Sequence, residues 1–183
     1  MRIISGSHRG RNIVTPNNLV VRPTTDFAKE SLFNILFNYL DFEGLAVLDL
    51  FAGTGSISFE FASRGCYKVV TVDNNFKCIH FIKETAQKMK LSAIHTIEAN
   101  VFNLLKFHHD KYDIIFADPP YELPHIQDLP SLIFDHLLLN PKGWFILEHS
   151  RDHDFSTHPM LYQHREYGKV NFSFFVNDLD SEE

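Results

Sequence analysis

The chain contains few cysteines and no long apolar stretch. Its two cysteines, Cys66 and Cys78, are too few for a disulfide framework and fit a reducing compartment, so we expect a cytoplasmic protein. No run of 18 or more apolar residues is present, and the polar start Met1–Gly6 lacks the features of a signal peptide, so we expect no membrane association. The 44% hydrophobic and 22% charged content predicts one globular domain.

Metal-binding patterns are also missing, although histidine is abundant. Among the 11 histidines, the best candidate ligand pairs are His108 with His109 and His149 with His153. Neither pair has cysteine partners or a third ligand at the spacing of zinc sites. Both cysteines lie far along the chain from the aspartate–proline motif described below, so a thiol nucleophile is not expected. We therefore predict that the protein binds no metal.

Positive charge is concentrated near the N-terminus. The chain has a formal net charge of −6, yet its first 25 residues hold no acid and four arginines: Arg2, Arg9, Arg11 and Arg22. The remaining residues carry −10, so they disfavour phosphate contacts elsewhere on the surface. We interpret the arginine segment as a nucleic-acid-binding element, to which His8 and Lys29 could add. A solvated hairpin that happens to contain arginines is the alternative.

The most specific motif follows an apolar run at residues 112–117. This run is typical of a buried strand, and Asp118-Pro119-Pro120-Tyr121 comes directly after it, where open α/β sheets bind ligands. The two prolines stiffen the backbone and remove two N–H donors. Asp118 and the Pro119 carbonyl can accept both N–H bonds of a planar amine, and Tyr121 can stack on its ring. We predict that these four residues are catalytic, with a chance strand-ending turn as the alternative.

A glycine-rich turn follows another apolar strand, at residues 45–50. Gly53 and Gly55 allow positive φ and let a ligand approach the backbone, and the next helix offers free N–H groups at its N-terminus. Ser58 occupies the third glycine position of the dinucleotide-binding G-x-G-x-x-G, so that fingerprint is incomplete. Asp49 would repel a pyrophosphate, but its carboxylate suits the cationic amino-acid end of a ligand.

The next strand ends on Asp73, 18 positions after Gly55 and near the spacing of about 20 at which a carboxylate binds ribose hydroxyls. Ribose hydroxyls, a cationic amino acid and adenine together describe S-adenosylmethionine. The residues predicted to bind this cofactor are Asp49, Phe51, Ala52, Gly53, Thr54, Gly55, Asp73, Asn74, Asn100, Val101 and Asp118. Asn100 could instead cap a helix, and for Asn74 a helix cap is favoured over ligand contact. Val101 or Phe102 could pack on the adenine.

These motifs together resemble the Rossmann-like methyltransferases that modify exocyclic amines with S-adenosylmethionine. The blocks Arg2–Gly6, Arg9–Arg11, Arg22–Asp26 and Glu30–Asn34 narrow the resemblance to the bacterial 16S ribosomal RNA guanine-N2 methyltransferase family, from Met1 to about His149. The resemblance implies methyl transfer to the N2 amine of a guanine in 16S rRNA. We expect this RNA to lie within the small ribosomal subunit or an assembly intermediate, and we expect the protein to be a monomer. The residues then expected to bind RNA are Arg2, Arg9, Arg11, Arg22, Thr24 and Thr25.

The order of strand and helix patterns predicts an α/β fold. We expect strands at 45–50, 68–72, 94–98, 112–117 and 143–148, and helices at 56–64, 75–90, 100–107 and 127–139. An antiparallel pair is expected at 161–164 and 170–176, and the family resemblance implies a seven-stranded mixed sheet flanked by helices. A small hairpin at 3–4 and 12–14 precedes a helix that starts near 23–26. We divide the chain into an RNA-binding extension, residues 1–42, and a methyltransferase core, residues 43–183.

Two other functions remain open from the sequence. The Asp-Pro-Pro-Tyr motif also permits an adenine-N6 or other amine methyltransferase acting on DNA or protein, although the chain has no room for a separate target-recognition domain. A non-enzymatic RNA-binding protein on a methyltransferase scaffold is the third possibility. The mass of the product separates the first two, and loss of cofactor binding would favour the third.

Overall fold

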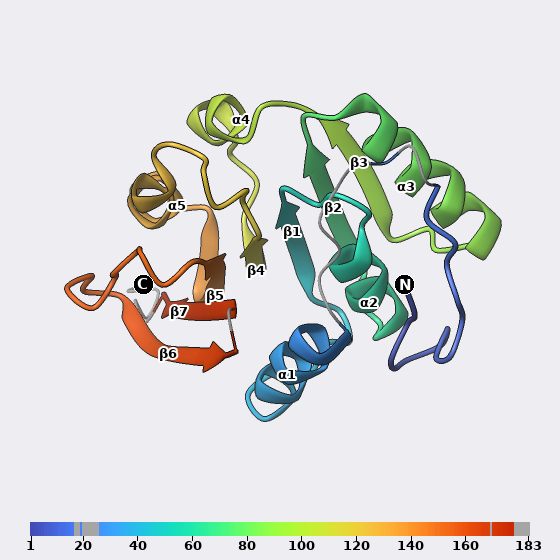
Figure 1. Ribbon diagram of the computed structural model, residues 1–183, viewed down its shortest axis with the longest axis horizontal. Helices are drawn as coiled ribbons and strands as arrows, with labels where there is room; N and C mark the ends of the chain where they lie inside the picture. Colours follow the sequence, from blue (N-terminus) through green and yellow to red (C-terminus); the bar gives the residue numbers. More distant parts are fainter. Residues whose placement is uncertain (17–18, 20–25, 169, 178–183) are drawn as a thin grey trace.

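Seven strands form one mixed sheet in the order β3-β2-β1-β4-β5-β7-β6 (Figure 1). The computed structural model describes residues 1–16, 19, 26–168 and 170–177. The strands are β1 (Ala46–Leu50), β2 (Lys68–Asp73), β3 (Ile94–Glu98), β4 (Tyr112–Ala117), β5 (Leu139–His149), β6 (Leu161–Tyr167) and β7 (Val170–Val176). Strands β3, β2, β1, β4 and β5 are parallel, and β7 is antiparallel to both β5 and β6. The predicted seven-stranded mixed sheet is confirmed.

The order of the strands reverses beside β1. The chain runs outward from β1 to β2 and β3 and then returns to β4 on the other side of β1. In open α/β sheets, the carboxyl ends of the strands leave a crevice for ligands at such a reversal. All five residues of β1 are buried, as expected for a parallel strand covered on both faces. The glycine turn after β1 and the Asp118–Tyr121 motif after β4 therefore meet at one crevice.

Helices cover both faces of the sheet. One face packs against α1 (Asp26–Phe37), α2 (Ser56–Ser63) and α3 (Phe76–Met89), and the other against α4 (Val101–Phe107) and α5 (Leu129–Asp135). Val47 and Leu48 are neighbours in β1 and belong to different hydrophobic clusters, because successive strand residues point to opposite faces. No helix in the described part of the chain combines the length and apolarity needed to cross a bilayer.

The N-terminal residues pack on the layer of α1 and α2. Arg2 and Asn12 form an isolated antiparallel bridge, so the predicted hairpin is present as a single bridge and not as two strands. Ile3 and Ile13 are buried in the same hydrophobic cluster as α1 and α2. The division of the chain at residue 42 stays a prediction.

Two predicted elements have different bounds. In place of the helix at 127–139, a 3-10 turn (Ile126–Asp128) precedes α5, which ends at Asp135. The strand expected at 143–148 begins at Leu139, so the predicted turn Pro141–Gly143 lies inside β5. The pairing of β5 with β4 shifts register there and Lys142 has a φ of 61°, an irregularity at which proline is tolerated. The elements expected between residues 45 and 117 agree within one residue.

Candidate active site

A cavity of about 390 Å³ opens at the carboxyl ends of the central parallel strands. The residues that line it are Phe51, Ala52, Gly53, Thr54, Asp73, Asn74, Asn75, Asn100, Val101, Phe102, Asp118, Pro119, Pro120, Tyr121 and Leu123. The structure thus brings together all four residues predicted to be catalytic. It also gathers every predicted cofactor-binding residue except Asp49 and Gly55, which lie behind the wall. Asn75 and Leu123 were not anticipated from the sequence.

Asp73 organises the turn after β1. Its Oδ2 accepts a hydrogen bond from the backbone N–H of Gly53 at 2.8 Å, and its Oδ1 accepts one from Asn75 N–H at 2.8 Å. A carboxylate has about four lone-pair sites, so Asp73 keeps acceptor capacity toward the cavity. The same side chain therefore shapes the glycine turn and keeps carboxylate oxygens at the wall of the cavity.

Gly55 supports the cavity from behind. It precedes α2 with a φ of 75°, a left-handed conformation that glycine adopts without strain. A Cβ at this position would lie 2.8 Å from Ile82 Cγ1 and 3.1 Å from Phe59 Cε2, so a larger residue would push on the packing of α3 and α2. Gly55 consequently acts through the shape of the turn.

Asp49 is buried beneath the cavity, with 1% of its surface exposed. Its Oδ2 accepts a hydrogen bond from Ser58 Oγ, and Ser58 Oγ lies 2.8 Å from Thr71 Oγ1. Burial raises the pKa of Asp49 to about 7; the Ser58 hydrogen bond opposes this shift, and the charges of Asp118 and Asp73 add to it. Three carboxyl groups thus converge on one region, which favours a cationic ligand.

The Asp118 motif closes the other side of the cavity. Asp118 follows β4, which pairs with β1, and its backbone N–H donates to the Leu50 carbonyl at 3.4 Å. Pro119 is buried, whereas Asp118 and Tyr121 are half-buried and line the cavity. The Asp118–Tyr121 motif and the glycine turn therefore line one cavity from the two sides of the β1–β4 crevice.

Two asparagines cap helices at the rim of the cavity. Asn75 Oδ1 accepts from Lys77 N–H at the start of α3, so the cap expected at Asn74 is wrong by one residue. The sequence Asp-Asn-Asn offered two adjacent candidates, and only the backbone conformation distinguishes them. Asn100 Oδ1 caps α4 by accepting from Asn103 N–H at 3.1 Å, and Asn100 also lines the cavity. Its two proposed roles are compatible.

The arginines of the N-terminal segment are separated in space. Arg2 lies beside the start of α2, since its carbonyl accepts from Lys29, which also bonds Ser56. Arg9 and Arg11 are exposed in a loop at the other end of this helix, where Ser7 N–H donates to the Ser63 carbonyl at 2.7 Å. A Cβ on Gly6 would lie 1.8 Å from that carbonyl oxygen, so the loop docks tightly. The predicted RNA-binding residues Arg22, Thr24 and Thr25 lie outside the described residues.

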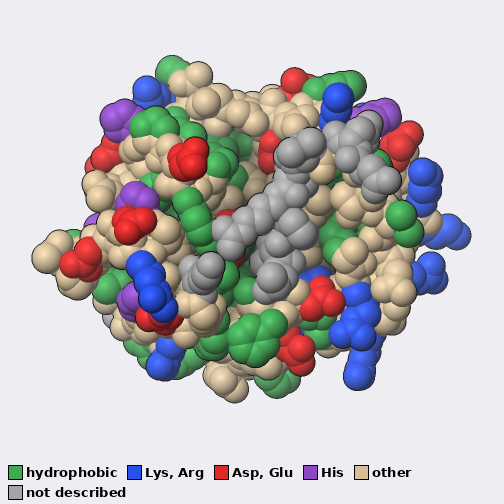
Figure 2. Space-filling model, in the orientation of Figure 1, with side chains coloured by type: hydrophobic (Ala, Val, Ile, Leu, Met, Phe, Trp, Pro, Cys, Tyr) green, Lys and Arg blue, Asp and Glu red, His purple; other side chains and the backbone are tan. Residues whose placement is uncertain are grey.

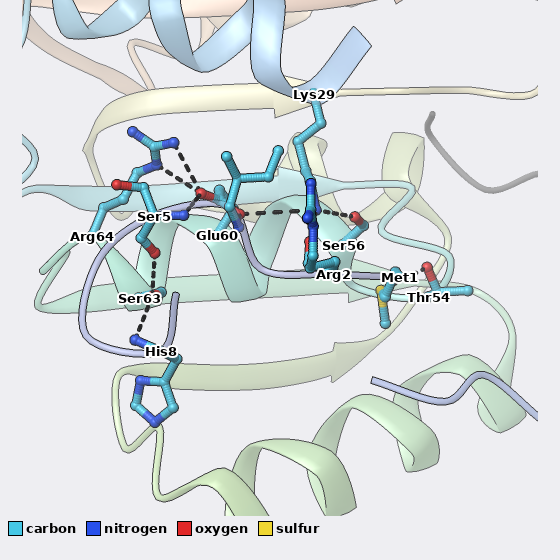
Figure 3. A network of polar contacts seen from close by, with 11 residues as sticks. Met1, Arg2, Ser5, His8, Lys29, Thr54, Ser56, Glu60, Ser63 and Arg64 are labelled. Carbon is cyan, nitrogen blue, oxygen red and sulfur yellow. Dashed lines mark hydrogen bonds and ion pairs between the residues drawn. The ribbon is translucent and has the colours of Figure 1, made fainter. Parts of the chain in front are cut away.

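A buried carboxylate holds the N-terminal segment on α2 (Figure 3). Glu60 is fully buried, and its oxygens accept from the backbone N–H groups of Ile4 and Ser5 at 2.9 and 3.0 Å. Arg64 completes the site, with both Nε and Nη2 at 2.9 Å from Glu60 Oε1. Glu60 was not anticipated from the sequence, although a single acid within an otherwise uncharged helix is a detectable signal.

Lys29 belongs to this network and not to the surface. It is 1% exposed, and its Nζ lies 3.8 Å from Glu60 Oε2. The ammonium donates to the Arg2 carbonyl at 2.6 Å and to Ser56 Oγ at 3.2 Å. Burial lowers the pKa of Lys29, and the charge of Glu60 opposes that shift. The suggestion that Lys29 adds to an exposed basic patch is therefore wrong, because the Lys29 side chain points from α1 toward α2.

The cysteines and histidines form no catalytic centre in the part of the chain that the structure describes. Cys66 and Cys78 are buried, and burial raises their thiol pKa values to about 12 and about 11, so both remain protonated near neutral pH. Within the described ranges, no group of three or more His, Cys, Asp or Glu residues could hold a metal ion. That the protein binds no metal stays a prediction.

The fold and the cavity define a Rossmann-like methyltransferase architecture. A family model described as "Conserved hypothetical protein 95" matches residues 1–176, and the chain belongs to this family. YlbH of Bacillus subtilis is 35% identical over 156 residues, which cover 83% of this chain and 84% of that protein. The Ribosomal RNA small subunit methyltransferase D of Buchnera aphidicola subsp. Baizongia pistaciae is 30% identical over 181 residues, covering 97% and 92%.

Among solved structures, yhhF from Escherichia coli superimposes with a TM-score of 0.86 at 23% identity, covering 98% of this chain and 99% of that one. At this identity the likeness concerns the fold. The matched residues extend well past His149, where the sequence resemblance had weakened, so β7 also belongs to the shared architecture. The predicted family and fold class are confirmed.

Proposed function

We propose that this protein transfers a methyl group from S-adenosylmethionine to the exocyclic N2 amine of a guanine in 16S ribosomal RNA. The observation that carries the proposal is the single cavity shared by the glycine turn, Asp73 and the Asp118–Tyr121 motif. Membership of a family whose curated relatives include Ribosomal RNA small subunit methyltransferase D supports the substrate. The choice of guanine and of N2 rests on the family.

The residues around the cavity fit S-adenosylmethionine. Asp73 offers carboxylate oxygens to ribose hydroxyls, Asn100 offers an amide to the adenine edge, and Phe102 an apolar surface to its ring. The charge of Asp49 interacts with those of Asp118 and Asp73. Asp49 therefore adds negative potential for the cationic end of the cofactor. When bound, the cofactor supplies a methyl group activated by a sulfonium.

The Asp118 motif would orient the acceptor amine. Asp118 and the Pro119 carbonyl accept the two N–H bonds of the amine, which aims its lone pair into the cavity, and the Asp118 carboxylate stabilises the positive charge that develops on nitrogen. Tyr121 stacks on the base, an interaction worth about 1–3 kcal/mol. The guanine must leave its stack to reach the cavity, at a cost of a few kcal/mol.

We also propose a setting for the reaction. The free, buried cysteines suit a reducing cytoplasm. Small ribosomal subunits or their assembly intermediates are the proposed substrate, and the protein is proposed to act as a monomer without metal.

Cofactor affinity should depend on pH through Asp49. A bound cation favours the carboxylate form, so binding lowers the pKa of Asp49 from its value of about 7 and releases a proton. If the pKa falls by about one unit, affinity rises about fivefold between pH 6 and pH 8. Calorimetry at several pH values measures this change. In the Asp49→Asn variant, the rise in affinity with pH should vanish. An unchanged pH profile in that variant would show that another group causes the pH dependence.

The proposed function is tested with small ribosomal subunits from cells that lack this gene. We expect labelled methyl transfer from S-adenosylmethionine, with N2-methylguanosine at one position in the nucleoside digest. N6-methyladenosine, or label in protein, would support the other amine methyltransferases instead. If the protein binds the cofactor but transfers no label, DNA and other proteins become the substrates to test.

A further inference from the structure

Two segments that are far apart in the sequence bring positive charge to one side of this protein. Residues 1–13 and 76–96 together hold seven cations and one acid, Glu84. Because the whole chain carries −6 and these two segments +6, the rest of the chain carries −12. Figure 2 shows lysine and arginine side chains along the right-hand side, where Figure 1 draws α3 and the N-terminal segment. The two segments thus form the basic side of an acidic protein.

A hydrogen bond joins the two segments. His8 Nε2 lies 2.9 Å from the carbonyl of Met89, the last residue of α3. The loop that carries Arg9 and Arg11 therefore sits next to the C-terminal end of this helix. Lys90, which caps α3, extends the same end of the surface.

A groove of about 560 Å³ runs between α3 and β3, with Lys83, Gln87, Lys90 and His95 among its lining residues. Positions 83 and 87 are one helical turn apart and share one face of α3, and Lys90 follows as the C-cap of this helix. In the described part of the chain, the salt bridges include none from Lys83, Lys90, Arg9 or Arg11, whereas Glu84 pairs with Lys88 and His80. Four cations thus remain available to an external anion.

The helix also connects the loop with the cavity. Asn74 and Asn75, which line the cavity, directly precede α3, and its 14 residues span about 21 Å. Arg9 and Arg11 lie at the far edge of the sheet from the cavity, so a ligand that occupies both must cross the surface of α3. A nucleic-acid strand has this length and charge, whereas a small anion does not.

We propose that the groove along α3, with Lys83 and Lys90, binds the phosphate backbone of the ribosomal RNA that flanks the target nucleotide. This inference rests on the proposed function and adds α3 to the arginines of the N-terminal segment. Contacts of this kind set the position of the RNA without reading its sequence. Their contribution decreases steeply with salt, because each neutralised phosphate releases counterions.

The test compares two charge-reversal variants. Lys83→Glu/Lys90→Glu changes the proposed surface, and Lys106→Glu/Lys111→Glu makes the same change in net charge at exposed positions in and after α4. Affinity for the small-subunit RNA is measured by filter binding from 50 to 300 mM salt, over which the Debye length falls about 2.4-fold. We expect the α3 variant to bind at least about fivefold more weakly at low salt, with a salt slope reduced by about two.

The control variant should bind within about twofold of the unmodified protein, because the rest of the surface already repels RNA. Equal weakening in both variants would indicate general electrostatics, and unchanged binding in the α3 variant would remove the groove from the interface. Methyl transfer by the unmodified protein is measured in parallel. No transfer to small ribosomal subunits from cells that lack this gene overturns the proposed function, while the affinities still decide the role of the groove.

Discussion

We expect the Asp118→Ala variant to transfer methyl groups about 10²- to 10³-fold more slowly than the unmodified protein while it still binds S-adenosylmethionine. Asp118 lines the cavity beside Pro119, where its carboxylate can accept from the amine and stabilise charge on nitrogen. Alanine removes that acceptor without filling the cavity. Single-turnover transfer measures the chemical step, and calorimetry measures cofactor affinity separately.

Glu122→Ala is the matched control for this prediction. Glu122 is an exposed carboxylate four positions further on and does not line the cavity, so its removal should leave turnover within about twofold. Asp118→Ala should also shift the pH dependence of cofactor binding to lower pH, because the charge of Asp118 raises the pKa of Asp49. Full turnover in the Asp118 variant would eliminate its proposed role in the reaction.

We expect Glu60→Ala to destabilise the protein by about 3–5 kcal/mol, because it leaves Lys29 and Arg64 charged without their partner. Lys29 is 1% exposed, so water cannot replace the lost carboxylate. The backbone N–H groups of Ile4 and Ser5 lose their acceptor as well, which releases the N-terminal segment from α2. Urea unfolding measures the loss, and the melting temperature should fall by about 10 °C.

Two further variants separate the charge from the packing. Glu60→Leu combined with Lys29→Met removes both buried charges and should recover much of the stability lost in Glu60→Ala. Glu84→Ala breaks an exposed pair with Lys88 and should change the free energy of unfolding by less than about 1 kcal/mol. A Glu60→Ala protein as stable as the Glu84→Ala protein would show that the buried network contributes little.

The fold and the cavity were predictable from local sequence for one physical reason. Parallel strands place their carboxyl ends along one edge, so motifs that follow strands meet there however far apart they lie in the chain. Asp73 is the last residue of its strand, Asn100 and Asp118 come just after theirs, and all three line the cavity. The boundaries of β5 were less predictable. The segment Pro141–Gly143 predicts a turn, but an irregularity in strand pairing accommodates the proline inside the strand.

By itself, the sequence determined the succession of strands and helices along the chain. It also determined the glycine turn and the Asp118–Tyr121 motif, because each depends on neighbours along the chain. Only the tertiary structure decided which charges are buried. Lys29 and Arg9 both look like surface cations in the sequence, yet α1 places Lys29 against Glu60 while the loop leaves Arg9 in water. Burial depends on what other segments pack against a side chain, and that information is not local.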